Sequence, residues 1–404
     1  MNTNFKFKTL TAALFCAFLF FGSYTSEVTP SGFPSYKILM LLTFFIFIFN
    51  AQQVLAVCQK NKLLITLLFY SLLSAIWANS PMNIVRHFIF LLSILFISIM
   101  TALAFPENKA TQIRWMFGLF LMLTLASIMT AIYLPKVGIM PMIGGVSRWK
   151  GITPHPNTLG AQLLLLIWLS ANLFFLSKSR IEKSIILFAI VAAFYALLKA
   201  DSMTSFITSL AIIGLTCYYY LFTRITISTK LILYTLTALS FLVIFTFYMS
   251  ATELAETSLA STGRNTTFTG RSIIWQTALK YASDHIILGY GFDGLEQLTK
   301  KTHIEMSHLH NGYIEILLQG GLIASILLGF ILIKTLLHQL RIKSTHKHEF
   351  IFLNTGLVMI LVHNITESSI LRGLNPLNIF LIFIIVSTSM ITTKSVYETS
   401  VTNK

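Results

Sequence analysis

The sequence is poor in charge and nearly free of cysteine. Only 11% of its 404 residues are charged, and 14 acidic residues stand against 29 lysines and arginines. Cys16, Cys58 and Cys217 are scattered in or beside apolar runs, which excludes a disulfide framework and a cysteine-based metal site. Prolines are few, and those early in the chain fall between apolar runs or at their ends, so they leave the runs themselves unbroken.

Apolar sequence is abundant instead. Apolar residues make up 55% of the chain, the mean hydropathy is +0.76, and runs of about 20 residues recur, each long enough to cross a bilayer. Because backbone groups in lipid need internal partners, the runs predict an all-α polytopic integral membrane protein. The predicted spans lie near residues 10–22, 37–57, 63–78, 85–105, 113–134, 157–177, 184–199, 203–222, 230–250, 311–340, 349–370 and 375–393.

The first apolar run resembles a secretory signal peptide, because Lys6 and Lys8 precede it. Residues 24–26 form a poor cleavage site, however, and many spans follow, so an uncleaved first helix is favoured. Basic residues are dense in the short loops of one side, which predicts about twelve spans with both termini in the cytoplasm. The net charge of +15 is therefore assigned to the flanks of spans and not to nucleic-acid binding.

Three segments follow from this arrangement. Residues 1–250 form a predicted N-terminal bundle of about nine spans, 251–310 a large outer loop, and 311–404 the C-terminal spans and a cytoplasmic tail. Within the loop, residues 270–282 have a helical period that places Ile274, Trp275, Ala278, Leu279 and Ala282 on one face. This pattern predicts an amphipathic helix that lies on the membrane surface or packs on the ends of the spans.

Polar residues that could bind a substrate collect on the outer side. Arg148, Lys150, His155 and Asn157 lie in a stretch rich in Pro and Gly just before a span. A snorkelling basic flank is the alternative, but the surplus of polar groups favours a site. Arg271 stands near the start of the amphipathic helix, where its planar guanidinium and the free N–H groups of the first turn suit an anion.

Two further polar groups leave a structural interpretation open. Lys199 and Asp201 stand between two apolar runs and could simply pair with each other. Glu367 and Arg372 lie at the outer end of a span, where ionisable groups are costly and often functional, or else belong to a packed polar network.

His308, His310 and Asn311 lie where the outer loop re-enters the membrane. An imidazole titrates near neutrality, so it suits the removal of a proton from a sugar hydroxyl. Zinc is disfavoured, because no second cluster of Cys or carboxylates stands at ligand spacing. A structural histidine at a helix start is the alternative.

The order of these pieces resembles the O-antigen ligase/polymerase family, whose members are bacterial inner-membrane glycosyltransferases with a GT-C-like helical fold. The resemblance rests on residues 148–160, Gly270-Arg271 with Trp275, Leu288-Gly289-Tyr290-Gly291-Phe292, His308–Asn311 with Gly320-Gly321, and Glu367. It implies a metal-independent, inverting transfer, without a cofactor, from an undecaprenyl-diphosphate-linked glycan at the periplasmic face.

Carried over residue by residue, the resemblance makes Arg271 the diphosphate arginine and His310 the general base. It implies a substrate-binding role for Arg148, Lys150, His155, Asn157, Lys199, His308, Asn311, Glu367 and Arg372. The chain departs from the family at Met203, where a second arginine is common. Either Arg148, Lys150 or Lys199 supplies the missing charge, or the substrate differs.

Three functions remain open. A ligase would join the glycan to lipid A–core, whereas an O-antigen or exopolysaccharide polymerase would use another lipid-linked repeat as the acceptor. A flippase or transporter of lipid-linked sugars would need charges that line a path through both leaflets, but here the polar groups crowd the outer side. A protein-glycosylating member of the family is a further alternative to the ligase.

Overall fold

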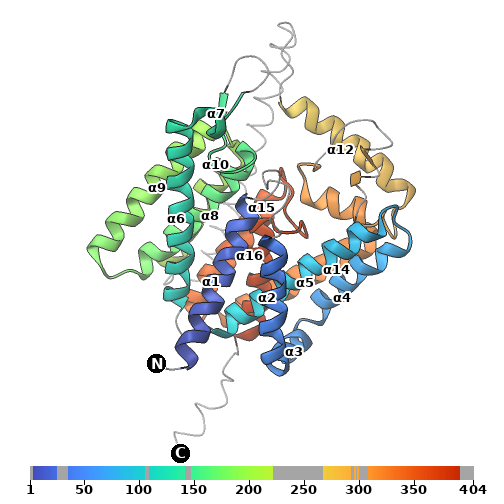
Figure 1. Cartoon of the computed structure of the whole chain (residues 1–404), viewed down its shortest axis with the longest axis horizontal. Coiled ribbons are helices and arrows are strands. Elements are labelled where there is room, and N and C mark those ends of the chain that lie inside the picture. The colour runs from blue at the N-terminus through green and yellow to red at the C-terminus, as the bar shows by residue number, and fades with distance from the viewer. Residues whose placement is uncertain are drawn as a thin grey trace, which may run out of the picture.

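The computed structural model describes residues 3–24, 35–104, 109–141, 147–221, 267–292, 295–296, 298–299 and 308–391. Nearly all of them are helical, with one short β-hairpin (Figure 1). The helices are α1 (Thr3–Tyr24), α2 (Ser35–Phe49), α3 (Ala51–Lys60), α4 (Lys62–Leu73), η1 (Ser74–Ile76), α5 (Pro81–Ala104), α6 (Lys109–Tyr133), α7 (Pro135–Gly138), α8 (Pro156–Leu176), α9 (Arg180–Ala200), α10 (Met203–Leu221), α12 (Thr267–Asp284), α14 (Gly312–Ile342), α15 (Lys347–His363) and α16 (Pro376–Met390). The hairpin pairs β1 (Ile139–Pro141) with β2 (Ser147–Trp149) in antiparallel register.

Six of the described helices are long and apolar enough to cross a membrane, namely α5, α6, α8, α9, α10 and α14. The helical class expected from the sequence is therefore confirmed, and the six candidate spans agree with a polytopic membrane protein. The count of about twelve spans stays a prediction, because the span expected at 230–250 and most of the loop 251–310 lie outside the described residues.

Two predicted spans differ from the observed helices. The segment expected as a span at 37–57 is bent, since Met40–Ile48 and Ala51–Lys60 meet at 99°. The second piece contains four polar residues among its ten, and its Val54 and Val57 pack in the core. The span expected at 349–370 ends as a helix at His363, and the Asn364 side chain accepts hydrogen bonds from the backbone N–H groups of residues 369 and 370 in the turns that follow.

The core of the molecule lies around α8, which is buried over most of its length. Trp168 of α8 is fully buried, stacks on Phe352 with ring centroids 4.5 Å apart, and meets Phe380 edge to face. Gly356 allows this contact, because a Cβ there would lie 2.5 Å from the indole ring. On the periphery, α9 exposes Leu187, Phe188 and Val191, as a helix facing lipid does.

Helix α14 is broken near its start, at Gly321, which has a φ of 61°. Residues 286–291 form backbone hydrogen bonds with α14 around this break. The N–H groups of Tyr290 and Gly291 donate to the carbonyls of residues 318 and 319, and the N–H of residue 322 donates to the carbonyl of Ile286. A Cβ on Gly289 would meet the Gln319 carbonyl oxygen at 2.4 Å, and one on Gly321 would meet that of Ile287 at 2.3 Å. The two glycine motifs noted in the sequence therefore serve a close backbone crossing.

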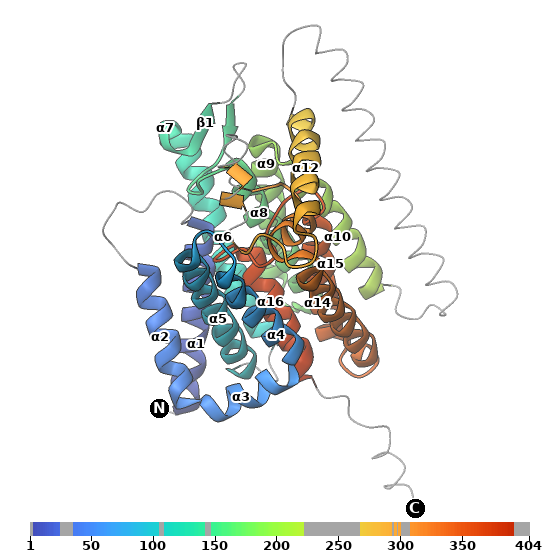
Figure 2. The same cartoon turned by 90° about the vertical axis from the view of Figure 1, so that its right-hand side faces the viewer.

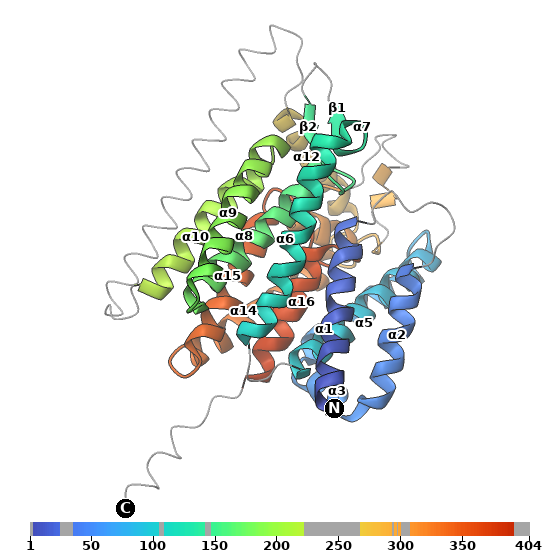
Figure 3. The same ribbon diagram turned by 60° about the vertical axis from the view of Figure 1, so that its left-hand side comes forward.

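The two ends of the molecule differ. Helix α12 and the β1–β2 hairpin lie at one end, and α3 lies at the other (Figures 2 and 3). Most of the apolar face predicted for α12 is buried or partly buried. Ala278 and Ala282 are buried in a cluster with Leu309 and Leu318, whereas Leu279 is exposed. The helix thus packs on α14, which agrees with the second of its two expected placements.

Candidate functional site

Four segments that are distant in sequence meet at Glu367. They are the start of α8, helix α12, the loop before α14 and the turn after α15. Glu367 is only 7% exposed, and both of its carboxylate oxygens accept hydrogen bonds. A buried carboxylate needs such partners, so this contact set explains why an acidic residue is accommodated there.

The partners of Glu367 come from three elements. Oε1 accepts from Arg271 Nη2 at 2.9 Å and from Asn157 Nδ2 at 2.8 Å, and Oε2 lies 3.2 Å from His310 Nδ1. Burial alone would raise the pKa of Glu367, but the hydrogen bond from His310 and the positive charge of Arg271 lower this pKa to about 2. The group is therefore a carboxylate at physiological pH.

Arg271 is held in a fixed plane. Besides Glu367, its guanidinium donates from Nη1 to the Thr366 carbonyl at 3.0 Å, and its side chain is 16% exposed. One turn further along α12, Trp275 Nε1 donates to the Leu309 carbonyl at 2.8 Å. Helix α12 thus fixes both the arginine and the loop that carries the histidines.

His310 sits at a bend in that loop. It adopts a positive φ of 51°, and Asn311 then caps α14 by accepting from the N–H groups of residues 313 and 314. The Asn311 N–H donates to Ser368 Oγ, and the Gly312 N–H reaches the carbonyls of Asn364 and Glu367. The backbone around His310 is therefore tied to the turn that supplies Glu367.

His308 stands further from the carboxylate. Its Nε2 is 3.8 Å from Glu367 Oε2, and its ring lies 3.9 Å, centroid to centroid, from that of His310. Burial, together with the neighbouring His310 and Arg372, lowers the pKa of His308 to about 3. His308 is thus a neutral imidazole at physiological pH.

Arg148 lies on the other side of Asn157. Arg148 is 8% exposed. Its Nη2 donates to Asn157 Oδ1 at 3.0 Å and to the Asp201 carbonyl at 2.7 Å. Its Nε donates to the Ala200 carbonyl at 2.8 Å. Burial lowers the pKa of Arg148, partly offset by Asp201 and Glu367. Its guanidinium therefore stands beside the α9–α10 junction, two residues before Met203.

The other predicted site residues have different positions. His155 caps α8 through its Nδ1, and Arg372 lies close enough to influence His308. Lys199 is exposed, with its ammonium 5.9 Å from the ring centroid of Tyr195, and no described contact joins Lys199 or Lys150 to Glu367. The Lys199–Asp201 pair considered from the sequence is not the observed one, since Asp201 Oδ2 lies 4.0 Å from Arg148 Nε.

Some residues that shape the site received no individual role from the sequence. Ser368 and the carbonyl of Thr366 receive hydrogen bonds from the loop and from Arg271, and Glu315 accepts from the Leu309 N–H. The Ser- and Thr-rich stretch after His363 was the available signal. That this stretch accepts hydrogen bonds from the histidine loop and from Arg271 could not be predicted, because these partners are distant in the sequence.

The ring nitrogens of His308 and His310 and a Glu367 oxygen lie within 4.8 Å of one another, so three groups of metal-ligand type do meet. The sequence spacing hid this cluster because Glu367 is remote from the histidines. The donor set does not fit a metal well: Glu367 already accepts from Arg271, Asn157 and His310, and a guanidinium next to the carboxylate repels a dication.

Part of the chain matches a family of known proteins. Residues 165–329 match the family described as O-antigen ligase. This range contains Arg271, His308 and His310, whereas Arg148, Asn157 and Glu367 lie outside it.

A relative supports the same class. The chain is 27% identical over 213 residues to the exopolysaccharide production protein ExoQ of Rhizobium meliloti (strain 1021). The matched region covers 49% of this chain and 48% of that protein, so the chain spans about half the length of the relative. Together the two matches support membership in the O-antigen ligase/polymerase family, which confirms the resemblance seen in the sequence.

Proposed function

We propose that the protein is an O-antigen ligase-type glycosyltransferase that moves a glycan from undecaprenyl diphosphate to a sugar hydroxyl of lipid A–core. The observation that carries the proposal is the contact of His310 with a buried carboxylate beside Arg271. A base and an anion-binding group next to each other are what transfer from a sugar diphosphate requires.

In this proposal His310 is the general base. A carboxylate only accepts hydrogen bonds, so Nδ1 of His310 must carry a proton toward Glu367, and Nε2 is left to accept one. The acceptor hydroxyl loses its proton to Nε2 as its oxygen bonds to the anomeric carbon. The bond from that carbon to the diphosphate breaks on the opposite side, so the configuration inverts.

Arginines hold the leaving group. In this proposal the guanidinium groups of Arg148, Arg271 and Arg372 bind the diphosphate. Arg148 reaches the backbone beside Met203 and so replaces the family arginine that is absent there. The cations, and no metal ion, then stabilise the charge that develops on the diphosphate.

The setting of this reaction is the bacterial inner membrane. With both termini in the cytoplasm, the end of the molecule that carries α12 and Glu367 faces the periplasm, where the lipid-linked glycan and the acceptor meet. The apolar helix faces would accommodate the prenyl tail of the donor.

A second candidate is an exopolysaccharide polymerase, in which the acceptor is another lipid-linked repeat. The similarity to a protein named for exopolysaccharide production favours it. The same base and arginines serve either acceptor, since both supply a sugar hydroxyl.

Deletion of the protein distinguishes the two candidates. Rough lipopolysaccharide with accumulated long lipid-linked polymer is expected for the ligase. Core capped with one repeat, or unchanged lipopolysaccharide with lost exopolysaccharide, would replace the ligase with a polymerase. Transfer in vitro from a lipid-linked donor should persist in EDTA, and its loss, restored by a divalent metal, would contradict the metal-free mechanism.

A further inference from the structure

Lys334 is a charged residue inside the long apolar helix α14, and the proposed reaction makes no use of it. It lies 22 residues after Gly312 and 13 residues beyond the break in α14 at Gly321. Its ammonium reaches the carbonyl of Lys60 at the end of α3, and α3 lies at the end of the molecule opposite α12 (Figures 2 and 3), so Lys334 lies toward the membrane interface opposite the Glu367 site.

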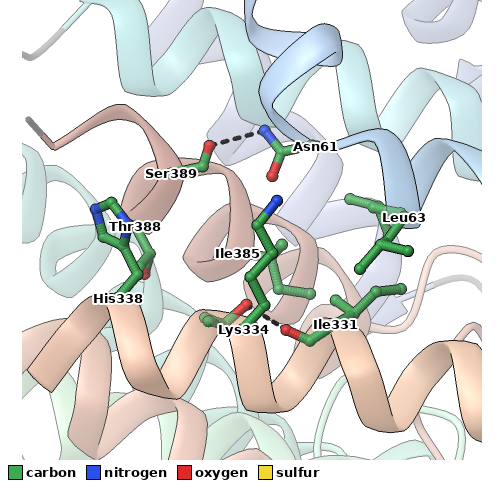
Figure 4. Close-up of a pocket in the computed structure, with 10 residues that line it drawn as sticks. Asn61, Leu63, Ile331, Lys334, His338, Ile385, Thr388 and Ser389 are labelled. Carbon is green, nitrogen blue, oxygen red and sulfur yellow. Dashed lines mark hydrogen bonds between the residues drawn. The ribbon is translucent and has the colours of Figure 1, made fainter.

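A hollow surrounds the Lys334 side chain. It is small inside, about 30 Å³, and open at its mouth, and it lies between the α3–α4 junction, α14 and α16 (Figure 4). In Figure 4 Lys334 and His338 point from α14 toward Asn61 and Ser389. The lining residues are Asn61, Leu63, Leu64, Ile331, Lys334, Thr335, His338, Ile385, Thr388 and Ser389.

The lining combines positive and polar groups with apolar walls. Lys334 Nζ donates to the carbonyl of Lys60, the last residue of α3, and His338 Nε2 lies 2.9 Å from the Ile391 carbonyl. An ammonium has three N–H donors, and this hydrogen bond uses one of them. None of the described residues that line the hollow is a carboxylate, so the positive charge of Lys334 has no anionic partner there.

We propose that the open mouth of this hollow binds the phosphate of an anionic phospholipid headgroup at the membrane interface opposite the Glu367 site. The phosphate would contact Lys334, with His338 and Asn61 at its edge, while the acyl chains lie along the exposed apolar side chains of α14 such as Ile333 and Leu337. Basic pockets between spans at the cytoplasmic side suit anionic headgroups, and the apolar wall favours a lipid over a free anion.

The test uses the full-length protein in detergent, titrated with phosphatidylglycerol or phosphatidylcholine and read by native mass spectrometry. Wild type should bind phosphatidylglycerol in preference to phosphatidylcholine. Lys334→Gln should weaken phosphatidylglycerol binding about fivefold, whereas Lys334→Arg should retain it. Lys178→Gln, which removes an exposed lysine from the α8–α9 loop outside the hollow, is the matched control and should bind as wild type does.

Equal binding of the two lipids, or an unchanged affinity in Lys334→Gln, would overturn the proposal. Inorganic phosphate added at the same concentration as the lipid separates the two sources of the anion. If it displaces phosphatidylglycerol, the hollow takes free phosphate and the lipid assignment is wrong. His338→Ala, measured in the same way, provides a second test if Lys334→Gln does not survive purification.

Discussion

Single residues around Glu367 have separable roles. Its two oxygens accept from Asn157, Arg271 and His310, which belong to three different segments. A substitution of one of these three residues therefore removes one hydrogen bond to Glu367, while the other two partners still position the carboxylate.

The first prediction concerns the guanidinium of Arg271. Arg271→Ala should lower transfer by about 10²–10³-fold, as the loss of one group that stabilises developing charge does in other enzymes. Arg271→Lys should recover little, because one ammonium cannot reproduce the two contacts to Thr366 and Glu367. Transfer is measured in vitro with lipid-linked donor, and Lys280→Ala, an exposed change on the same helix, is the control. Wild-type activity in Arg271→Lys would show that diffuse charge suffices.

The second prediction separates the two histidines. His310 lies 3.2 Å from the carboxylate and His308 3.8 Å, so the former is the better oriented base. His310→Ala should lose about 10²–10⁴-fold in transfer while donor binding persists, and His310→Gln should be nearly as defective. His308→Ala should be milder. The reverse order in the same assay would move the base to His308.

The third prediction concerns pH and stability. The pKa of His308 is lowered to about 3 in the folded protein, whereas an unfolded histidine titrates near 6.5. The unfolded state therefore binds the extra proton, so the stability that His308 contributes is complete above about pH 6.5 and is lost as the pH falls toward 3, at about 1.4 kcal/mol per pH unit. Thermal unfolding in detergent should show this loss between pH 6.5 and 4.5, and His308→Asn should reduce it. An equal slope in the variant would mean that His308 is charged in the fold.

At the scale of elements, the break in α14 determines where the histidine loop stands. The Leu288–Phe292 segment crosses the backbone of α14 at Gly321, and Tyr70 of α4 donates from its hydroxyl to the carbonyls of Leu288 and Gly320. Helix α12 then packs against the first turns of α14. His310 and Arg271 thus rest on one interlocked unit.

The fourth prediction tests this crossing. Gly321→Ala places a Cβ 2.3 Å from the Ile287 carbonyl oxygen at a positive φ, so it should destabilise the protein by about 1–3 kcal/mol or more and reduce transfer. Gly329→Ala in the same helix has no atom within 4 Å of the added Cβ and should be neutral or slightly stabilising. Thermal unfolding in detergent measures both. Equal stability of the two variants would contradict the described crossing.

At the scale of the whole molecule, the Glu367 site and the Lys334 hollow lie at opposite ends of α14. This polarity fits a membrane protein that meets its substrates on one side and cytoplasmic-leaflet lipids on the other. The orientation itself rests on the distribution of basic residues in the sequence.

The fifth prediction tests that orientation in a variant that lacks Cys16, Cys58 and Cys217. A cysteine at Gln276, exposed on α12, should react with an impermeant thiol reagent added from the periplasm. A cysteine at Ser344, between α14 and α15, should react only after the cells are opened. Labelling of Ser344→Cys alone in intact cells would invert the topology and, with it, the proposed periplasmic site.

The sequence by itself determined the class of the molecule and the positions of most helices, because apolar runs in lipid have few structural solutions. Helices α5, α6, α8, α9 and α10 lie within a few residues of their predicted spans. It also identified the polar segments that contribute to the site, since charges beside spans are costly and conspicuous.

Only the tertiary structure decided which of those groups meet. Glu367 is 57 residues from His310 and 210 from Asn157, and no local pattern encodes such contacts. The same limit explains why Lys199 seemed a partner for Asp201, while the fold places Arg148 there. Hydropathy is a property of each residue, namely the free-energy cost of its transfer out of water. The site instead depends on how helices that are distant in sequence pack together.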